Sequence, residues 1–107
     1  MTFIIKQNDT SPALLARLVK PDRTAADVSG AAVLFHLRNK RNRNTVLIAP
    51  AAVVDGPTGV VRYDWAVGDT QTAGDYEGEF QVTYVDTTVE TFPNEGYMEI
   101  IIPAELA

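Results

Sequence analysis

The sequence predicts a single all-β domain of the sandwich type. Three observations support this: short runs of alternating polar and apolar residues, turn residues between those runs, and no amphipathic helical pattern of ten residues or more. At 107 residues the chain is one domain, residues 1–107, long enough to bury about two-thirds of the surface that it would expose when unfolded. We therefore expect a hydrophobic core that needs no crosslinks.

The clearest strand is the stretch DYEGEFQVTYV at residues 75–85, whose aromatic and aliphatic residues fall on one face while its glutamates fall on the other. The stretch AAVLFHLR at residues 31–38 repeats this pattern. Further strand candidates span residues 2–6, 13–19, 45–54, 60–65, 88–92 and 97–102. Proline, glycine, asparagine and aspartate separate them, as turns require. The segment 13–19 is the one serious helical contender, and it is too short to decide.

The last strand candidate, YMEIII at residues 97–102, is apolar on both faces. Met98, Ile100 and Ile102 share one side, and Ile101 lies on the other. Either the rest of the domain covers both faces or a partner covers one of them. Ile101 is therefore a candidate protein-contact residue.

Charge divides the chain into two unequal halves. Residues 1–63 hold all nine Lys and Arg and four acids, a formal charge of +5, whereas residues 64–107 hold ten acids and no Lys or Arg, a formal charge of −10. Such asymmetry can orient a subunit against a charged neighbour. Alternatively, strands from the two halves interleave in space and the charges largely cancel.

The composition excludes several classes of protein and of site. With no cysteine the chain can form no disulfide and no thiolate zinc site, and its redox compartment is not indicated. Only three consecutive apolar residues precede Lys6, too few for a signal-peptide core or a membrane span. The single histidine, His36, has no carboxylate partner at motif spacing, and no calcium loop, paired-carboxylate motif or phosphate loop is present. We expect no enzyme activity, no cofactor and no metal.

The aromatic residues allow a second interpretation, since exposed rings could stack on sugars. Most of them, Tyr63 and Trp65 included, fall in step with the aliphatic face of their strand, so core packing is favoured. An exposed Trp65 beside Tyr97 would instead indicate a carbohydrate-binding face.

The stretch RNKRNRN, residues 38–44, holds four of the nine basic residues and joins two strands. The asparagines at 39, 42 and 44 tolerate the left-handed backbone that hairpin loops demand. Three interpretations remain open: a plain solvated turn, a contact with an acidic protein face such as that of Glu77, Glu79 and Glu90 in another copy, or a nucleic-acid contact. The rest of the chain carries −9 and opposes a polyanion, which disfavours nucleic acid. The candidate contact residues are Arg38, Lys40, Arg41 and Arg43.

The segment DTQTAGDYEGEFQV at residues 69–82 resembles the tyrosine corner of immunoglobulin-like sandwiches, in which a tyrosine hydroxyl bonds to backbone a few residues upstream. Tyr76 would hold that place. Gly78 stands where the second cysteine of antibody domains would be. The expected fold is thus an Ig-like antiparallel β-sandwich of seven or eight strands, without a disulfide.

Over nearly its whole length the chain resembles the N-terminal domain of phage baseplate upper proteins of the lactococcal type. The blocks that carry this resemblance are FIIKQNDTSPALLARL (3–18), DVSGAAVLFHLR (27–38), GVVRYDW (59–65), DTQTAGDYEGEFQVTYVD (69–86) and ETFP (90–93). The trimerising stalk of such proteins does not follow here. Before the ETFP block those proteins usually have an Asp-Gly hairpin turn. This chain has Asp86-Thr87-Thr88 there, so the turn must take a different form.

The resemblance implies a non-catalytic structural protein located in the virion, at the tail tip, baseplate or fibre attachment, which contacts other virion proteins and itself as a homo-oligomer. The alternatives are a module that binds carbohydrate or another host-surface ligand, and a head decoration protein.

Overall fold

A computed structural model describes residues 2–106 as an all-β domain of eight strands. The strands are β1 (Thr2–Ile4), β2 (Leu14–Arg17), β3 (Ala32–Asn39), β4 (Thr45–Asp55), β5 (Val60–Tyr63), β6 (Gly74–Thr83), β7 (Val89–Phe92) and β8 (Met98–Ile102). Every predicted strand is present, and the segment 13–19 contains a strand rather than a helix. The predicted all-β sandwich is confirmed.

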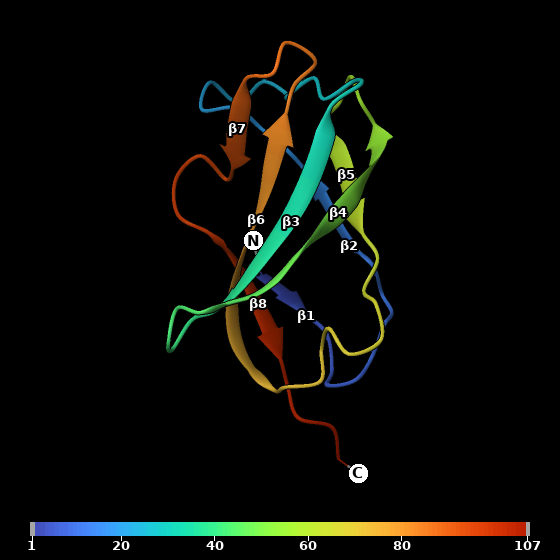
Figure 1. The fold of residues 1–107 in the computed structure, drawn as a ribbon, viewed down its shortest axis with the longest axis vertical. Helices are drawn as coiled ribbons and strands as arrows, with labels where there is room; N and C mark the ends of the chain where they lie inside the picture. Colours follow the sequence, from blue (N-terminus) through green and yellow to red (C-terminus); the bar gives the residue numbers. More distant parts are fainter. Residues whose placement is uncertain (1, 107) are drawn as a thin grey trace.

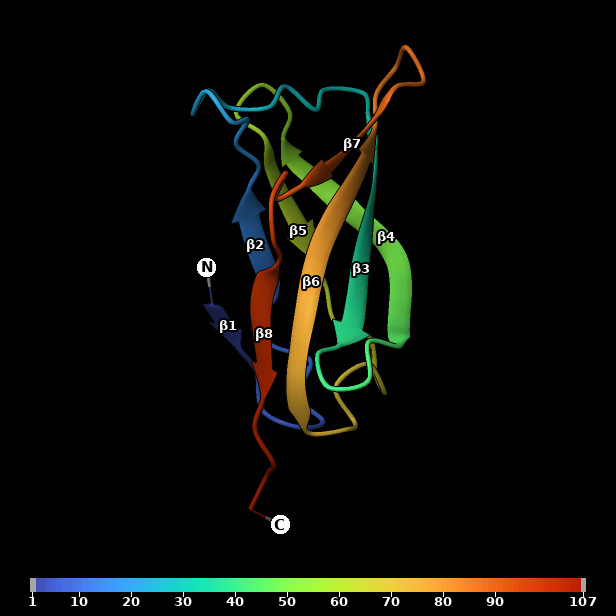
Figure 2. The same cartoon turned by 90° about the vertical axis from the view of Figure 1, so that its left-hand side faces the viewer.

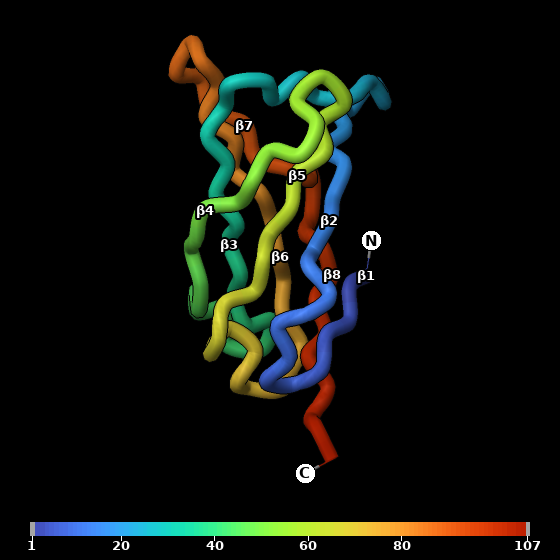
Figure 3. Tube along the Cα trace, turned by 90° about the vertical axis from the view of Figure 1, so that its right-hand side faces the viewer, coloured from blue at the N-terminus to red at the C-terminus, as the bar shows by residue number. Residues whose placement is uncertain are grey.

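The strands form two layers that share β4. One layer has the order β1-β8-β6-β3-β4, with β7 paired to the upper part of β6, and the other has the order β4-β5-β2. Figure 2 shows the first layer as a row, with β4 curving away at its upper end toward β5. In Figure 3 the second layer, β2 and β5, lies toward the viewer.

The strand β4 changes layers because its pairing changes along its length. From Thr45 to Ala51 it pairs with β3, and from Ala52 to Asp55 with β5. Both ladders are irregular, with register shifts between Leu37 and Arg38 on β3 and between Val53 and Asp55 on β4. Such irregularities bend a strand and increase its twist, which lets β4 pass from one sheet to the other.

The pairing is antiparallel with one exception, which the sequence did not predict. The first strand β1 runs parallel to β8, with Phe3 opposite Ile100. All other strand pairs are antiparallel. The sheet is therefore mixed.

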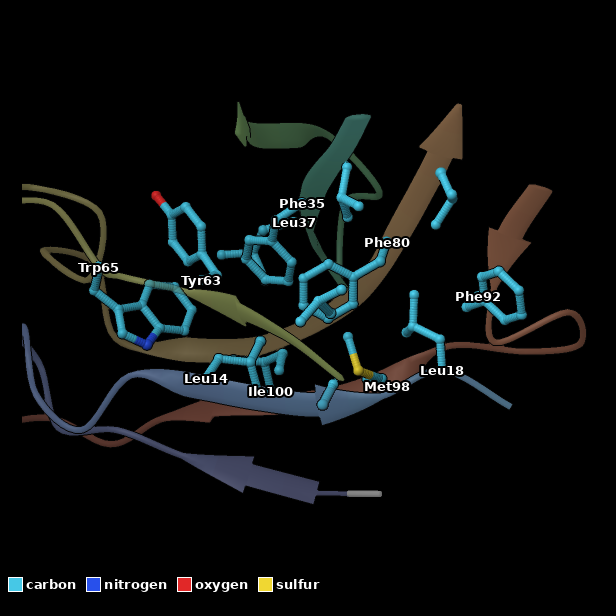
Figure 4. Close-up of a cluster of buried hydrophobic side chains, with 14 of the residues drawn as sticks. Leu14, Leu18, Phe35, Leu37, Tyr63, Trp65, Phe80, Phe92, Met98 and Ile100 are labelled. Carbon is cyan, nitrogen blue, oxygen red and sulfur yellow. The ribbon is translucent and has the colours of Figure 1, made fainter. Parts of the chain in front are cut away.

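The core fills the space between the layers, and the predicted inward faces supply it. Phe35, Phe80, Phe92 and Ile100 are among the largest fully buried side chains. Figure 4 shows their cluster with the rings of Tyr63 and Trp65. The Phe35 ring packs on that of Tyr63 with centroids 4.7 Å apart, and meets Trp65 edge-on at 5.6 Å. Aromatic packing thus joins β3 to β5 across the two layers.

Candidate protein-contact site

The basic hairpin, which we define as residues 39–44, joins β3 to β4 and protrudes at the lower end of the domain in Figure 1. The Asn39 side-chain oxygen accepts hydrogen bonds from the backbone N–H groups of Arg41 and Asn42, and Asn42 Oδ1 accepts from that of Asn44. These bonds organise the turn locally. Arg43 has a left-handed backbone, with φ of 62°. The three asparagines of the hairpin were expected to adopt this conformation, and none of them does.

Three of the predicted contact residues, Lys40, Arg41 and Arg43, lie exposed on the basic hairpin. Within residues 2–106 their side chains form no ion pair. They therefore remain available to a charged partner. Close cations repel one another, and an acidic partner would relieve that repulsion.

The fourth predicted contact residue, Arg38, belongs to β3 rather than to the turn. Its Nε lies 2.9 Å from Oε1 of Glu77 on the neighbouring β6, and its guanidinium lies 4.4 Å from the centre of the Tyr97 ring. The hydrogen bond to Glu77 raises the pKa of Arg38. Arg38 is thus held within its own domain and offers little free charge to a partner.

The expected acidic face of Glu77, Glu79 and Glu90 is not one surface. Glu77 and Glu79 point outward beside Arg38 and His36, whereas Glu90 lies opposite the buried Val82 and so faces the inner side of the sheet. All three carboxylates have cationic or imidazole neighbours in the same chain, and Glu90 binds Lys20 at 3.0 Å. They form no acidic patch for a partner's hairpin.

A shallow pocket of about 160 Å³ lies on the outer face of the sheet, lined in part by His36, Arg38, Thr45 and Tyr97. The His36 Nδ1 atom is 3.7 Å from Glu79 Oε1, and the His36 Nε2 atom is buried without a hydrogen-bond partner among the described residues. The pocket is thus polar and partly charged. No group of three His, Cys, Asp or Glu side chains able to hold a metal ion occurs within residues 2–106.

The outer side of β4 is apolar and exposed, which the sequence analysis missed. Val46 and Ile48 are 53% and 58% exposed, and Pro50 is exposed as well. We call these three side chains the β4 surface. No charged residue occurs from Thr45 to Val54. The signal that could have found this surface is an uncharged run of ten residues in a strand next to a strongly charged turn.

Ile101 is half-buried. On the outer face of β8 it lies opposite Ile4 of β1 on one side and Asp75 of β6 on the other. Ile4 is the more open of the two isoleucines, at 58% exposure. The other face of β8 is buried in the core through Met98, Ile100 and Ile102. The fold itself therefore covers part of the second apolar face.

The aromatic residues do not form a sugar-binding platform. Trp65 is buried, stacks against Phe3 and contacts Phe35 and Tyr63 edge-on. Tyr97 is exposed, but it lies under Arg38 and not beside Trp65. The arrangement that would indicate carbohydrate binding is therefore absent from the described surface.

The sequence matches no protein-family model and no curated protein. Among solved structures, the fold is similar to CopC from Methylosinus trichosporium OB3b, with a TM-score of 0.55 and 12% sequence identity over 99% of this chain and 87% of that chain. At this identity the likeness shows the fold, a β-sandwich. No described residue lies in a helix that could cross a membrane.

This comparison corrects the function expected from the sequence. CopC is not a phage structural protein, so the assignment as a tail, baseplate or head-decoration subunit is wrong. The expectation arose because each quoted block is a strand followed by a turn, and unrelated sandwiches share that pattern. The comparisons do not test the resemblance to baseplate upper proteins or the virion location, which stay predictions.

Proposed function

We propose that the chain is a non-catalytic binding module that engages another protein through the β4 surface. The observation that carries this proposal is the exposure of Val46, Ile48 and Pro50 within a ten-residue stretch free of charge. Strands at sheet edges usually carry charged residues that discourage association. From Thr45 to Ala51, β4 pairs with β3 alone among the described strands, so this part has one unpaired edge without such charges, which favours a partner.

The surroundings of the β4 surface fit a protein partner better than a small molecule. The surface lies along an exposed strand, whereas small-molecule sites are concave and enclose their ligand. Polar residues border it, with His36 opposite Ile48 on β3 and the basic hairpin at its end. An apolar centre with a polar rim is typical of protein interfaces.

The nearby polar groups support binding rather than catalysis. His36, the one histidine of the chain, is adjacent to Glu79, and Thr45 and Tyr97 supply hydroxyls in the same pocket. No hydrogen bond joins either hydroxyl to His36 in the described structure, so neither is coupled to that imidazole. Nucleic acid is disfavoured because the chain outside the basic stretch 38–44 carries −9.

Site-specific photocrosslinking tests the proposal. A benzophenone amino acid placed at position 48 should give a covalent adduct to a protein in cells that make the chain at its natural level. The matched control is position 15, because Leu15 on β2 is 56% exposed, close to the 58% of Ile48, but lies on the opposite layer. Equal adduct yields at the two positions, or no adduct at position 48, would show that the β4 surface binds no protein.

A further inference from the structure

We infer that the protein bound by the β4 surface is a second copy of this chain, packed with its β4 antiparallel to the first about a two-fold axis near Ile48. This inference rests on the proposed function, because it names the partner of the same surface. In a two-fold interface one patch meets itself. Such a patch needs an apolar centre and opposite charges at similar distances on its two sides.

The apolar centre is the β4 surface itself. Ile48 is its middle residue and is more exposed than Val46, at 58% against 53%. Val46 comes before it and Pro50 after it. An antiparallel pair of β4 strands centred on Ile48 places Val46 of each copy near Pro50 of the other. Every side chain of the centre therefore meets an apolar neighbour.

The basic side of the patch is the hairpin that precedes β4. Lys40, Arg41 and Arg43 are exposed and form no ion pair in the part of the chain that the structure describes. The hairpin that carries them lies where β4 begins, at the lower left of the domain in Figure 1.

The acidic side of the patch lies at the other end of β4. Asp55, the last residue of that strand, is exposed, and so is Asp27 in the adjoining loop. A backbone hydrogen bond of 2.9 Å from Val28 N–H to the Gly56 carbonyl holds this loop beside the strand end. Neither carboxylate forms an ion pair among residues 2–106.

The two charged ends are equally far from the apolar centre along the sequence. Arg41 precedes Ile48 by seven residues, and Asp55 follows it by seven. When two antiparallel β4 strands align Ile48 with Ile48, the basic hairpin of each copy approaches Asp55 of the other. This charged contact then forms twice, once at each end of the interface, which makes the surface self-complementary.

The polar and charged groups beside the centre do not oppose this packing, because each has a polar neighbour in its own chain. Arg38 binds Glu77 at 2.9 Å, and His36 lies 3.7 Å from Glu79. An uncompensated charge buried in an interface would weaken it, whereas a paired one can be covered at lower cost.

The first test measures the mass of the protein in solution by sedimentation and light scattering over a range of concentrations. We expect a dimer that dissociates as salt rises, because its charged ends lie at the solvent-exposed rim. Ile48→Glu should weaken the dimer by at least about tenfold. Leu15→Glu introduces the same charge at an equally exposed apolar site on β2 and should leave the dimer intact.

The second test uses charge complementation. Arg41→Glu with Arg43→Glu, and separately Asp55→Arg, each place like charges together at both ends of the dimer, so each variant alone should be monomeric. Mixed one to one, the two variants restore opposite charges at both ends and should form a heterodimer. Lys6→Glu reverses a charge just after β1, away from the β4 surface, and should remain dimeric.

The outcomes separate this inference from the proposed function. A monomer at all concentrations, together with a position-48 adduct to a different protein, overturns the second-copy inference and leaves the binding role intact. Absence of any position-48 adduct overturns both.

A mass that Ile48→Glu does not change, or variants that fail to complement, also exclude this dimer. If reversal of Arg41 and Arg43 instead abolishes binding of a DNA duplex and leaves the mass unchanged, the hairpin serves nucleic acid and the inference is wrong.

Discussion

The hydroxyl of Tyr76 donates a 2.6 Å hydrogen bond to the backbone carbonyl oxygen of Thr72, four residues earlier in the chain. Tyr76 is buried near the start of β6, so this bond fixes the turn that leads into β6 against the core. It is the contact that a tyrosine corner requires. Gly74, with φ of 155°, lies between the two residues and lets the chain reverse under the ring.

Tyr76→Phe should lower the free energy of unfolding by about 1 kcal/mol, because it removes the donor and retains the ring. Chemical denaturation monitored by fluorescence would measure the change, and the folded spectrum should be preserved. Thr72→Ala is the matched control, since it retains the carbonyl oxygen that accepts the bond. If the two variants cost the same, the Tyr76 hydroxyl does not stabilise this turn.

Gly59→Ala should destabilise the domain by about 3 kcal/mol or more, because two penalties combine. Gly59 has φ of 72°, and a Cβ atom there would lie 2.6 Å from the Ala26 carbonyl oxygen and 2.7 Å from that of Leu18. Thermal unfolding followed by circular dichroism would measure the loss.

Gly96→Ala separates the two penalties. Gly96 has a similar φ of 69°, and nothing lies within 4 Å of the position of its Cβ atom. This variant should cost only the conformational penalty of about 1 kcal/mol. Equal losses at the two glycines would show that the contacts around Gly59 can relax.

The strands were predictable because the signals that define them are local. Side chains alternate with period two along β3 and β6, and the turn residues between strands act over a few positions. Strand pairing is different, since it depends on partners distant in sequence. Neither the parallel contact of β1 with β8 nor the division of β4 between two layers leaves a local pattern.

The candidate site was predictable only in part for the same reason. A cluster of cations in a turn is visible in the sequence, and Lys40, Arg41 and Arg43 are exposed as expected. The ion pair between Arg38 and Glu77 depends on the register of β3 against β6, which the sequence did not specify. The β4 surface was missed because its alternation is between exposed and half-buried apolar residues, so no polar residue marks its outer face.

Acid should destabilise the domain through the aspartates that cap its turns. Hydrogen bonds from the side chain and backbone of Thr24 lower the pKa of Asp22, and those of Thr88 lower the pKa of Asp86. Because the unfolded chain binds these protons more readily, the stabilisation is complete above the ordinary aspartate pKa near 4 and is lost as pH falls below it. Unfolding midpoints measured from pH 6 to pH 2 should therefore fall.

Asp22→Asn with Asp86→Asn should flatten that decline and lower the stability at neutral pH. Asp75→Asn serves as the control for loss of charge, because the Asp75 side chain is exposed and makes no hydrogen bond within the described structure. The unfolding midpoint of the double variant could still fall with pH as steeply as that of the unmodified protein. In that case the acid sensitivity arises from other groups.

Alkali should destabilise the domain through Tyr63. Burial raises the pKa of this phenol, and the hydrogen bond that it donates to Asp69 raises it further. The unfolded chain loses the proton near pH 10 while the folded one retains it, so the stabilisation is complete below pH 10 and falls as pH rises above it.

Stopped-flow absorbance of the phenolate at alkaline pH should show Tyr63 ionising at the rate of unfolding. Tyr63→Phe should lower the amplitude of that slow phase by one phenolate, because Tyr76 is equally buried and still ionises in it. Tyr63 is 3% exposed, so a phase faster than unfolding that disappears in this variant would mean that solvent reaches the ring in the folded state.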